Sequence, residues 1–315
     1  MSQYLLVRIA QLVPSLFLAS IAIWALIYLL PGDPAIALLG PNATPDQVAA
    51  VRGALGLDQP PLVQYVSWLG RVLHGNFGIS YQTGLPVLEL IGSRAAATVQ
   101  LGTLSFLVSM VVGVALGVVA AARPTSLAAR LVGGYNSLTL AIPSFWLGLL
   151  LILLFGVWLH ILPPASAYIP IWQDPLGALR ASILPIITLA SYTSGIVARF
   201  VRAAMVDVLG ADYVRTARAK GVEESRVVWR HALRNALLPT VTVLGLQFGA
   251  FIGGAVVTEG VFNYPGLGTL VLNSVLSRDY TTLQATILMI VASFTLVNLA
   301  VDLLYAFLDP RIQVA

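Results

Sequence analysis

Long stretches without a charged residue are the feature that most constrains how this chain folds. Uncharged gaps lie at 9–32, 95–122, 131–173, 181–198, 235–258 and 280–301. A helix crosses the hydrocarbon core of a bilayer with roughly 20 apolar residues, because every backbone N–H and C=O must be paired within the segment there. The chain is 58% hydrophobic and 10% charged, whereas soluble domains carry about 25% charged residues. The sequence therefore predicts an all-α integral membrane protein with six transmembrane helices.

The gaps place the spans at 9–30, 98–121, 135–159, 183–203, 236–257 and 283–307. The gap 131–173 holds one span, because His160 and Pro163-Pro164 interrupt it. The neutral stretch 260–277 is rich in Gly, Pro and Asn, so it is expected to be an interfacial or re-entrant loop rather than a seventh span. Pro143 and Pro185 allow kinks in the third and fourth spans, although no discontinuous helix is evident.

Basic residues predict the orientation of these spans. With the N-terminus inside, 12 of the 17 basic residues lie on the cytoplasmic side and five lie outside. This bias predicts an N-in, C-in topology, and it accounts for the net charge of +4 without nucleic-acid binding. The apolar run after Arg8 is about 22 residues long, too long for a signal peptide, so residues 1–30 are expected to stay as the first span.

The spans divide the chain into four parts: residues 1–30 form the first span, 31–96 an extracytoplasmic segment, 97–308 a five-span core and 309–315 a cytoplasmic tail. The extracytoplasmic segment is expected to contain two short helices. Thr44 and Gln47 form a capping box at the start of the first, which ends at Gly56. The second runs from Pro61 to about His74 and shows apolar residues at helical spacing.

Small residues and polar residues within the spans suggest how the helices pack. Gly113 and Gly117 form a small-xxx-small pair, and Gly245, Gly249 and Gly253 form a longer one. Such residues let helix backbones approach closely in lipid, either within this chain or against a partner subunit. Polar side chains in the spans, such as Gln100, are expected to form helix–helix hydrogen bonds; the alternative is that they bind solute.

The middle of every span lacks Asp, Glu, Lys and Arg, which argues against coupling to an ion gradient. The phosphate-binding motif of an ATPase needs a Gly-Lys pair, yet Lys220 is the only lysine and it precedes a glycine. There are no cysteines, so disulfides and thiolate metal sites are excluded. A transporter with these features would draw its energy from elsewhere or be passive.

The segment 204–235 is the one long polar excursion predicted on the inner side. Residues 212–220 favour a short helix, Gly221 permits the left-handed residue that ends it, and Glu223-Glu224 suit the start of the next helix. This hairpin is suited to seating in a groove of a soluble partner. The alternative is a basic loop that only anchors the topology.

This loop resembles the cytoplasmic signature of ABC importer permeases, in which E-A-A is followed by three residues and Gly. Gly221 matches the glycine, whereas Arg215-Thr216-Ala217 stand at the E-A-A positions and only Ala217 agrees. The run Arg215 to Gly221 is typical of the dipeptide/oligopeptide (peptide/nickel) branch, first-permease subunit. Blocks matching that branch elsewhere are Leu30 to Pro34, Gly56 to Pro60, Trp68 to Gly70, Ile142 to Trp146, Thr258 to Gly268, Asn298 to Asp302 and Leu308 to Arg311.

The resemblance implies a type I ABC importer permease fold in the bacterial plasma (inner) membrane. The implied partners are a homologous second permease, two cytoplasmic ABC ATPases that bind ATP and Mg, and an extracytoplasmic solute-binding protein, with no cofactor in this chain. The implied ATPase-coupling residues are Arg215, Thr216, Ala217, Arg218, Ala219, Lys220, Gly221, Val222 and Glu223. Candidates for the pathway or outer gate are Gln247, Glu259 and Asn263. The branch imports dipeptides, oligopeptides, glutathione or nickel complexes, and the sequence does not select among them.

The sequence leaves two other function classes open. A stand-alone secondary or passive transporter of small solutes would act without ATPase partners. A membrane-embedded enzyme would require His, Asp and Glu side chains gathered near the bilayer, yet His74, His160 and His231 fall in three separate regions.

Overall fold

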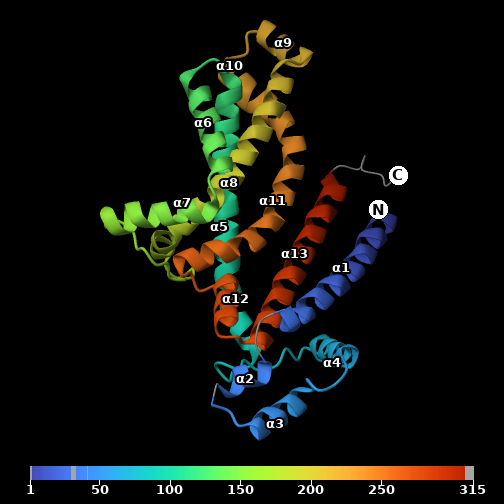
Figure 1. Ribbon diagram of the computed structural model, residues 1–315. Helices are drawn as coiled ribbons and strands as arrows, with labels where there is room; N and C mark the ends of the chain where they lie inside the picture. Colours follow the sequence, from blue (N-terminus) through green and yellow to red (C-terminus); the bar gives the residue numbers. More distant parts are fainter. Residues whose placement is uncertain (1, 30–32, 41, 309–315) are drawn as a thin grey trace. The chain divides into compact units, whose positions relative to one another are not determined.

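The computed structural model describes residues 2–29, 33–40 and 42–308 and is helical throughout its main elements (Figure 1). The helices, in chain order, are α1 (Ser2–Leu29), α2 (Pro34–Leu39), α3 (Pro45–Leu55), α4 (Pro61–Leu73), α5 (Val87–Ala122), α6 (Leu127–Ala141), α7 (Ser144–Leu151), the π-helical η1 (Ile152–Trp158), α8 (Pro175–Leu209), α9 (Asp212–Ala219), α10 (Glu224–Arg226), the π-helical η2 (Val227–Ala232), α11 (Leu233–Phe262), α12 (Leu267–Leu276) and α13 (Tyr280–Leu308). The predicted tail 309–315 lies outside the described residues.

The chain forms two compact units, which we describe separately. Among the described residues, unit 1 comprises those up to Thr98 together with Pro265–Leu299, and unit 2 comprises Val99–Tyr264 and Ala300–Leu308. Unit 1 is held by hydrogen bonds between distant elements. In it, the Gln284 side chain of α13 donates to the Trp24 carbonyl of α1 (3.0 Å), and the Leu267 amide donates to Thr98 Oγ1 (2.8 Å). Its apolar cluster is built on Val87, Ile91, Leu267 and Ala285.

The two short helices predicted for the segment 31–96 are confirmed as α3 and α4, whereas α2 was not predicted. Thr44 and Gln47 form the complete capping box of α3, and Gly56 ends that helix with φ 69°. Helix α4 runs from Pro61 to Leu73, with His74 at its C-cap. Proline at the first turn of α3 and α4 is favourable, since the missing N–H has no intrahelical partner there. Helix α5 begins at Val87, so the end of the predicted extracytoplasmic segment is already helical.

Unit 2 is built around the pairing of α8 and α11 (Figure 1). Both helices extend beyond the predicted spans: α8 covers Pro175–Leu209 and passes Pro185 without a break, and α11 covers Leu233–Phe262. Helices α6 and α7 also pack against α8. Because α8 runs to Leu209, the predicted polar loop 204–235 is helical for its first residues.

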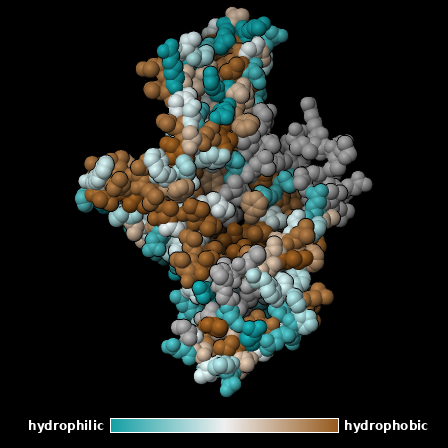
Figure 2. Space-filling model, in the orientation of Figure 1, coloured by the Kyte–Doolittle hydropathy of each residue, from teal (hydrophilic) through white to brown (hydrophobic). Residues whose placement is uncertain are grey.

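The third predicted span is wrong as a single continuous helix. It divides into α6 and the α7–η1 segment, which are bent by 107°. Ile142 between them is extended (φ −87°, ψ 123°), because the ring of Pro143 disfavours the helical conformation at the preceding residue. The α7–η1 segment carries exposed apolar side chains, among them Trp158 at 67% and Leu149 at 51%, and brown residues cover it in Figure 2.

The stretch 260–277 also differs from the predicted loop. Helix α11 continues through it to Phe262, and Leu267–Leu276 form α12. Asn263 separates them in the left-handed conformation, with φ 49°. With 10 residues, α12 rises about 15 Å and is too short to cross a bilayer.

Among the described residues, three helices are long and apolar enough to cross a membrane, namely Val87–Ala122, Pro175–Leu209 and Tyr280–Leu303. The bent pair Leu127–Ala141 and Ser144–Trp158 counts as a fourth if it forms one span. Helices α1 and α11 have 28 and 30 residues. A helix of roughly 20 residues rises about 30 Å, the thickness of the hydrocarbon core, so both helices are long enough to cross it by length alone.

Candidate functional site

The polar segment between α8 and α11 folds as the hairpin that the sequence predicts. We call residues 210–232 the coupling hairpin. Helix α9 covers Asp212–Ala219, and α10 and η2 form the returning arm from Glu224 to Ala232. The prediction of a helix–Gly–helix arrangement is confirmed, although its second arm is partly π-helical.

Gly221 ends α9 in the left-handed conformation, with φ +77°. The Gly221 amide donates to the Arg218 carbonyl (2.9 Å), and the Val222 amide donates to the Ala217 carbonyl (3.2 Å). These two bonds are the pair that defines a Schellman C-cap. These bonds satisfy two carbonyls at the end of α9. The turn is therefore fixed by backbone hydrogen bonds, and the residue in the left-handed conformation, Gly221, has no Cβ.

An ion pair joins the two arms of the coupling hairpin. Arg218 Nε and Nη2 donate to the two carboxylate oxygens of Glu224, at 3.0 and 2.7 Å. The hydrogen bonds from Arg218 lower the pKa of Glu224, and the same bonds raise the pKa of Arg218. Both side chains are substantially solvent-exposed, so the pair contributes no more than about 1 kcal/mol. A bidentate pair nevertheless fixes the angle between the arms.

Buried apolar residues connect the coupling hairpin to the long helices of unit 2. Val228 and Ala232 of the returning arm belong to one cluster with Val118 of α5, Val201 of α8 and Leu244 of α11. Asn235 Nδ2 also donates to the Tyr213 hydroxyl (2.8 Å), which ties α9 to the start of α11. The hairpin is thus joined to the long helices by close-packed side chains rather than by a flexible loop.

The outward side of the coupling hairpin is polar and cationic. Of the predicted coupling residues, Ala217 and Val222 are half-buried, whereas the others are exposed. The exposed set comprises Arg215, Thr216, Arg218, Ala219, Lys220, Gly221 and Glu223. Trp229 adds a large exposed ring at 53%. This surface combines arginines with an aromatic side chain, a composition enriched at protein interfaces.

The three residues predicted for the pathway or outer gate are not brought together. Glu259 is fully buried near the end of α11, whereas Asn263 is exposed at its C-cap. Gln247 lies twelve residues before Glu259 on the same helix, or about 18 Å along its axis. Only Glu259 and Asn263 therefore lie within about one helical turn of each other.

The loop 159–174 closes over this end of α11. The Ser166 amide donates to the Phe262 carbonyl (2.9 Å), and the rings of Tyr168 and Tyr264 meet edge to face at 6.5 Å. On α5, the Gln100 side chain donates to the Ile169 carbonyl (2.9 Å) and accepts from the Ile171 amide (3.0 Å). The prediction that Gln100 bonds helix to helix is therefore wrong, since it holds a loop, and the sequence contains no local signal for this pairing.

The predicted glycine contacts divide into two kinds. A Cβ added to Gly113 or Gly117 would lie 2.6 Å from the Cβ of Val197 or Val201, respectively. Close packing at these glycines is confirmed, and it is internal, between α5 and α8. A Cβ at Gly253 would meet nothing within 4 Å. Gly245 is half-buried, and the surroundings of Gly249 lie outside the described residues.

Family comparisons cover both ends of the chain. Residues 113–314 match the family "Binding-protein-dependent transport system inner membrane component", and residues 1–102 match its N-terminal counterpart, "Binding-prot-dependent transport system membrane comp, N-term". The chain belongs to this family. It is an inner-membrane permease of a binding-protein-dependent transport system.

Full-length relatives support the same assignment of the permease. It is 42% identical over 313 residues to a peptide transport system permease protein of Brucella abortus (strain 2308), with 99% of each chain covered. It is 42% identical over 318 aligned residues to the glutathione transport system permease protein GsiC of Escherichia coli (strain K12), again with 99% of each covered.

A solved structure shares the fold of the permease core. A chain of the MetNI methionine ABC transporter, solved in inward-facing conformations, superposes with a TM-score of 0.56 at 17% sequence identity. The match covers 71% of the permease and 98% of that chain. At this identity the similarity concerns the fold alone.

The ion pair between the arms of the coupling hairpin gives a testable prediction. Glu224→Gln removes the charge but keeps the shape, so we expect amide hydrogen exchange in Asp212–Lys220 to quicken about fivefold, the equivalent of losing about 1 kcal/mol. The folded-state pKa of Glu224 lies below its ordinary value of 4.5. The stabilisation of the hairpin by ionised Glu224 is therefore fully present above pH 4.5 and is lost only as the pH falls through the lowered pKa of Glu224. Exchange protection, corrected for intrinsic rates, should be constant from about pH 6 to 8.

The matched control is Glu223→Gln, because Glu223 is exposed and makes no capping hydrogen bond. This variant should exchange like the wild-type permease. Equal protection in Glu224→Gln and wild type would show that the ion pair does not order the hairpin.

Proposed function

We propose that the permease is one of two homologous membrane subunits of an ATP-driven importer for di- or oligopeptides, including glutathione. The coupling hairpin would seat in a cytoplasmic ABC ATPase, and a solute-binding protein would deliver the solute on the other side. The relatives named for peptide and glutathione transport support the substrate class. The chain lacks the Gly-Lys pair of the phosphate-binding motif, so ATP and Mg would be bound by the ATPases.

The observation that carries this proposal is the construction of the coupling hairpin. Its cap at Gly221 is closed by two backbone hydrogen bonds, and its returning arm is buried against α5, α8 and α11. A loop that only fixed topology would need neither feature. A rigid, exposed hairpin joined to the membrane helices suits the transmission of ATPase movement to the pathway.

The proposed topology has six spans with both termini in the cytoplasm. The spans would be α1, α5, the bent pair of α6 with α7–η1, α8, α11 and α13. Their lengths and the excess of basic residues on one side support this arrangement. It places the coupling hairpin on the cytoplasmic side and segment 31–96 on the extracytoplasmic side. Glu259 and Asn263, with loop 159–174 above them, would then form part of an outer gate.

Reconstitution tests the proposal against a stand-alone transporter. The permease is co-expressed with the second permease and the ATPases from its own organism, and the purified complex is placed in proteoliposomes with the solute-binding protein. We expect peptide uptake only with ATP and the binding protein, and unchanged uptake when ionophores remove ion gradients. Uptake by the permease alone, or uptake driven by a gradient without ATP, would favour a secondary transporter instead.

A further inference from the structure

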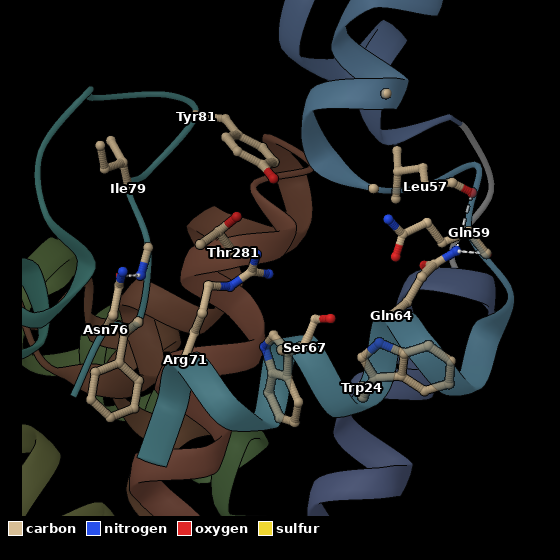
Figure 3. A pocket seen from close by; sticks show the side chains of 15 residues that line it. Trp24, Leu57, Gln59, Gln64, Ser67, Arg71, Asn76, Ile79, Tyr81 and Thr281 are labelled. Atoms are coloured by element: carbon tan, nitrogen blue, oxygen red, sulfur yellow. Dashed lines mark hydrogen bonds between the residues drawn. The ribbon is translucent and has the colours of Figure 1, made fainter. Parts of the chain in front are cut away.

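A cavity of about 570 Å³ lies within unit 1, away from the coupling hairpin in sequence (Figure 3). Five stretches of chain line it: α1, the end of α3 with the turn after it, α4, the loop after α4, and the start of α13. The lining residues are Trp24, Gly53, Gly56, Leu57, Gln59, Gln64, Ser67, Trp68, Arg71, Asn76, Phe77, Gly78, Ile79, Tyr81 and Thr281. Its size falls within the range of small-molecule sites, about 300–1,000 Å³.

Hydrogen bonds hold one wall of this cavity in place. The Gln64 side chain donates to the carbonyls of Leu57 (3.1 Å) and Gln59 (2.8 Å) and accepts from the Tyr28 hydroxyl (2.9 Å). Three elements, α1, α4 and the turn after α3, are therefore tied together at one side chain. Trp24 packs edge to face on Tyr65 at 5.6 Å, which fixes its ring at the cavity.

The opposite wall is held by Asp279 at the start of α13. Its carboxylate accepts from the hydroxyls of Ser80 (2.5 Å) and Thr282 (2.7 Å), so the loop after α4 is fixed to α13. Gly78 in this loop has φ +84°, and an added Cβ would lie 2.6 Å from Thr281 Cγ2. Only glycine allows so close an approach. The cavity is thus a formed site between fixed walls.

Arg71 is the one charged residue among those that line the cavity. In Figure 3 its side chain extends from α4 toward the middle of the space, below Thr281. Among the described residues, Arg71 takes part in no ion pair, whereas Arg52 of α3 pairs with both Asp33 and Asp58. The hydroxyls of Ser67, Tyr81 and Thr281 add hydrogen-bond donors without adding negative charge.

We propose that this cavity binds a small carboxylate that carries an apolar or aromatic group, as at the C-terminal residue of a short peptide. The guanidinium of Arg71 matches a carboxylate with two parallel hydrogen bonds. The rings of Trp24, Trp68 and Phe77 supply apolar area for the neighbouring side chain. That the ligand comes from the extracytoplasmic space rests on the proposed function and topology, whereas the binding itself does not depend on them.

The surroundings favour a free small ligand over a docked protein loop. The lining residues come from five separate stretches of chain, and the Arg71 side chain extends into the half-open space between them (Figure 3). A concave site with a few polar groups among apolar walls is typical of small-molecule binding. A protein partner would instead need a broad surface of about 800 Å² on each side.

The test compares the dipeptide Ala-Phe with its C-terminal amide, which lacks the carboxylate but keeps the ring. Binding to the whole transport complex in nanodiscs, without the solute-binding protein, is followed by calorimetry and by tryptophan fluorescence up to about 10 mM. We expect saturable binding of Ala-Phe and at least about tenfold weaker binding of the amide. Arg71→Ala should lose about the same factor, and Arg71→Lys should fall between, because lysine keeps the charge without the planar fork. Arg180→Ala, at an exposed arginine of α8 outside the cavity, is the matched control.

Three results would overturn the proposal: equal binding of Ala-Phe and its amide, unchanged binding by Arg71→Ala, or no saturable binding by the wild-type complex. If Arg71→Ala instead weakens association with the solute-binding protein while free peptide does not bind, the cavity is a docking site and the proposal is wrong. ATP-driven uptake by the wild-type complex tests the proposed function separately. A complex that transports peptide but does not distinguish acid from amide would leave that function standing.

Discussion

Replacing Gly221 with valine is expected to reduce ATP-driven peptide uptake about tenfold or more and to weaken co-purification of the ATPases. Gly221 has φ +77°, a conformation that is strongly unfavourable for β-branched residues and costs about 1–2 kcal/mol for an ordinary L-residue. Relief of this strain opens the cap that ends α9 and changes the angle between the two arms. Uptake into proteoliposomes and the ATPase-to-permease ratio after purification measure the effect.

The substitution acts through the backbone, because an added Cβ at Gly221 meets nothing within 4 Å. Gly221→Asn is therefore the matched control: asparagine tolerates the left-handed conformation and should keep most of the activity. Alanine should fall between asparagine and valine. Wild-type values of both uptake and co-purification in Gly221→Val would contradict the coupling role.

Features governed by neighbouring residues were predictable from the sequence. The capping box at Thr44, the helix end at Gly56 and the cap at Gly221 each depend on a few adjacent residues. Such signals are local, since a capping side chain or a left-handed glycine acts within one turn of helix. The close packing at Gly113 and Gly117 of α5 was also predictable, because only small residues let two helix backbones approach so closely.

Features that depend on distant residues were not predictable. Gln100 bonds a loop some 70 residues away (Ile169 and Ile171), and hydropathy contains no information on such a pairing. Pro143 indicated a kink, but the residues around it contain no signal for a bend as large as 107°. The cavity around Arg71 draws on residues from Trp24 to Thr281, so it exists only in the folded chain.

Gly117→Ala is expected to destabilise the permease by about 3 kcal/mol, although alanine is the better helix former. The added Cβ would lie 2.6 Å from Val201 Cβ and 2.8 Å from the Ala198 carbonyl oxygen. The carbonyl belongs to the backbone of α8 and cannot rotate away, so the two helices must separate. In lipid, association rests largely on such close packing, and thermal unfolding of the purified permease in detergent measures the loss.

Gly102→Ala makes the same change in the same helix at a position where the new Cβ meets nothing within 4 Å. Its stability should equal or slightly exceed that of wild type, as expected for glycine to alanine within a helix. Val201 also belongs to the buried cluster that holds Val228 and Ala232 of the coupling hairpin. Separation of α5 and α8 in Gly117→Ala should therefore raise hydrogen exchange in the returning arm as well. If Gly117→Ala and Gly102→Ala unfold alike, α5 and α8 are not in close contact; if only the hairpin remains protected, the cluster does not connect it to these helices.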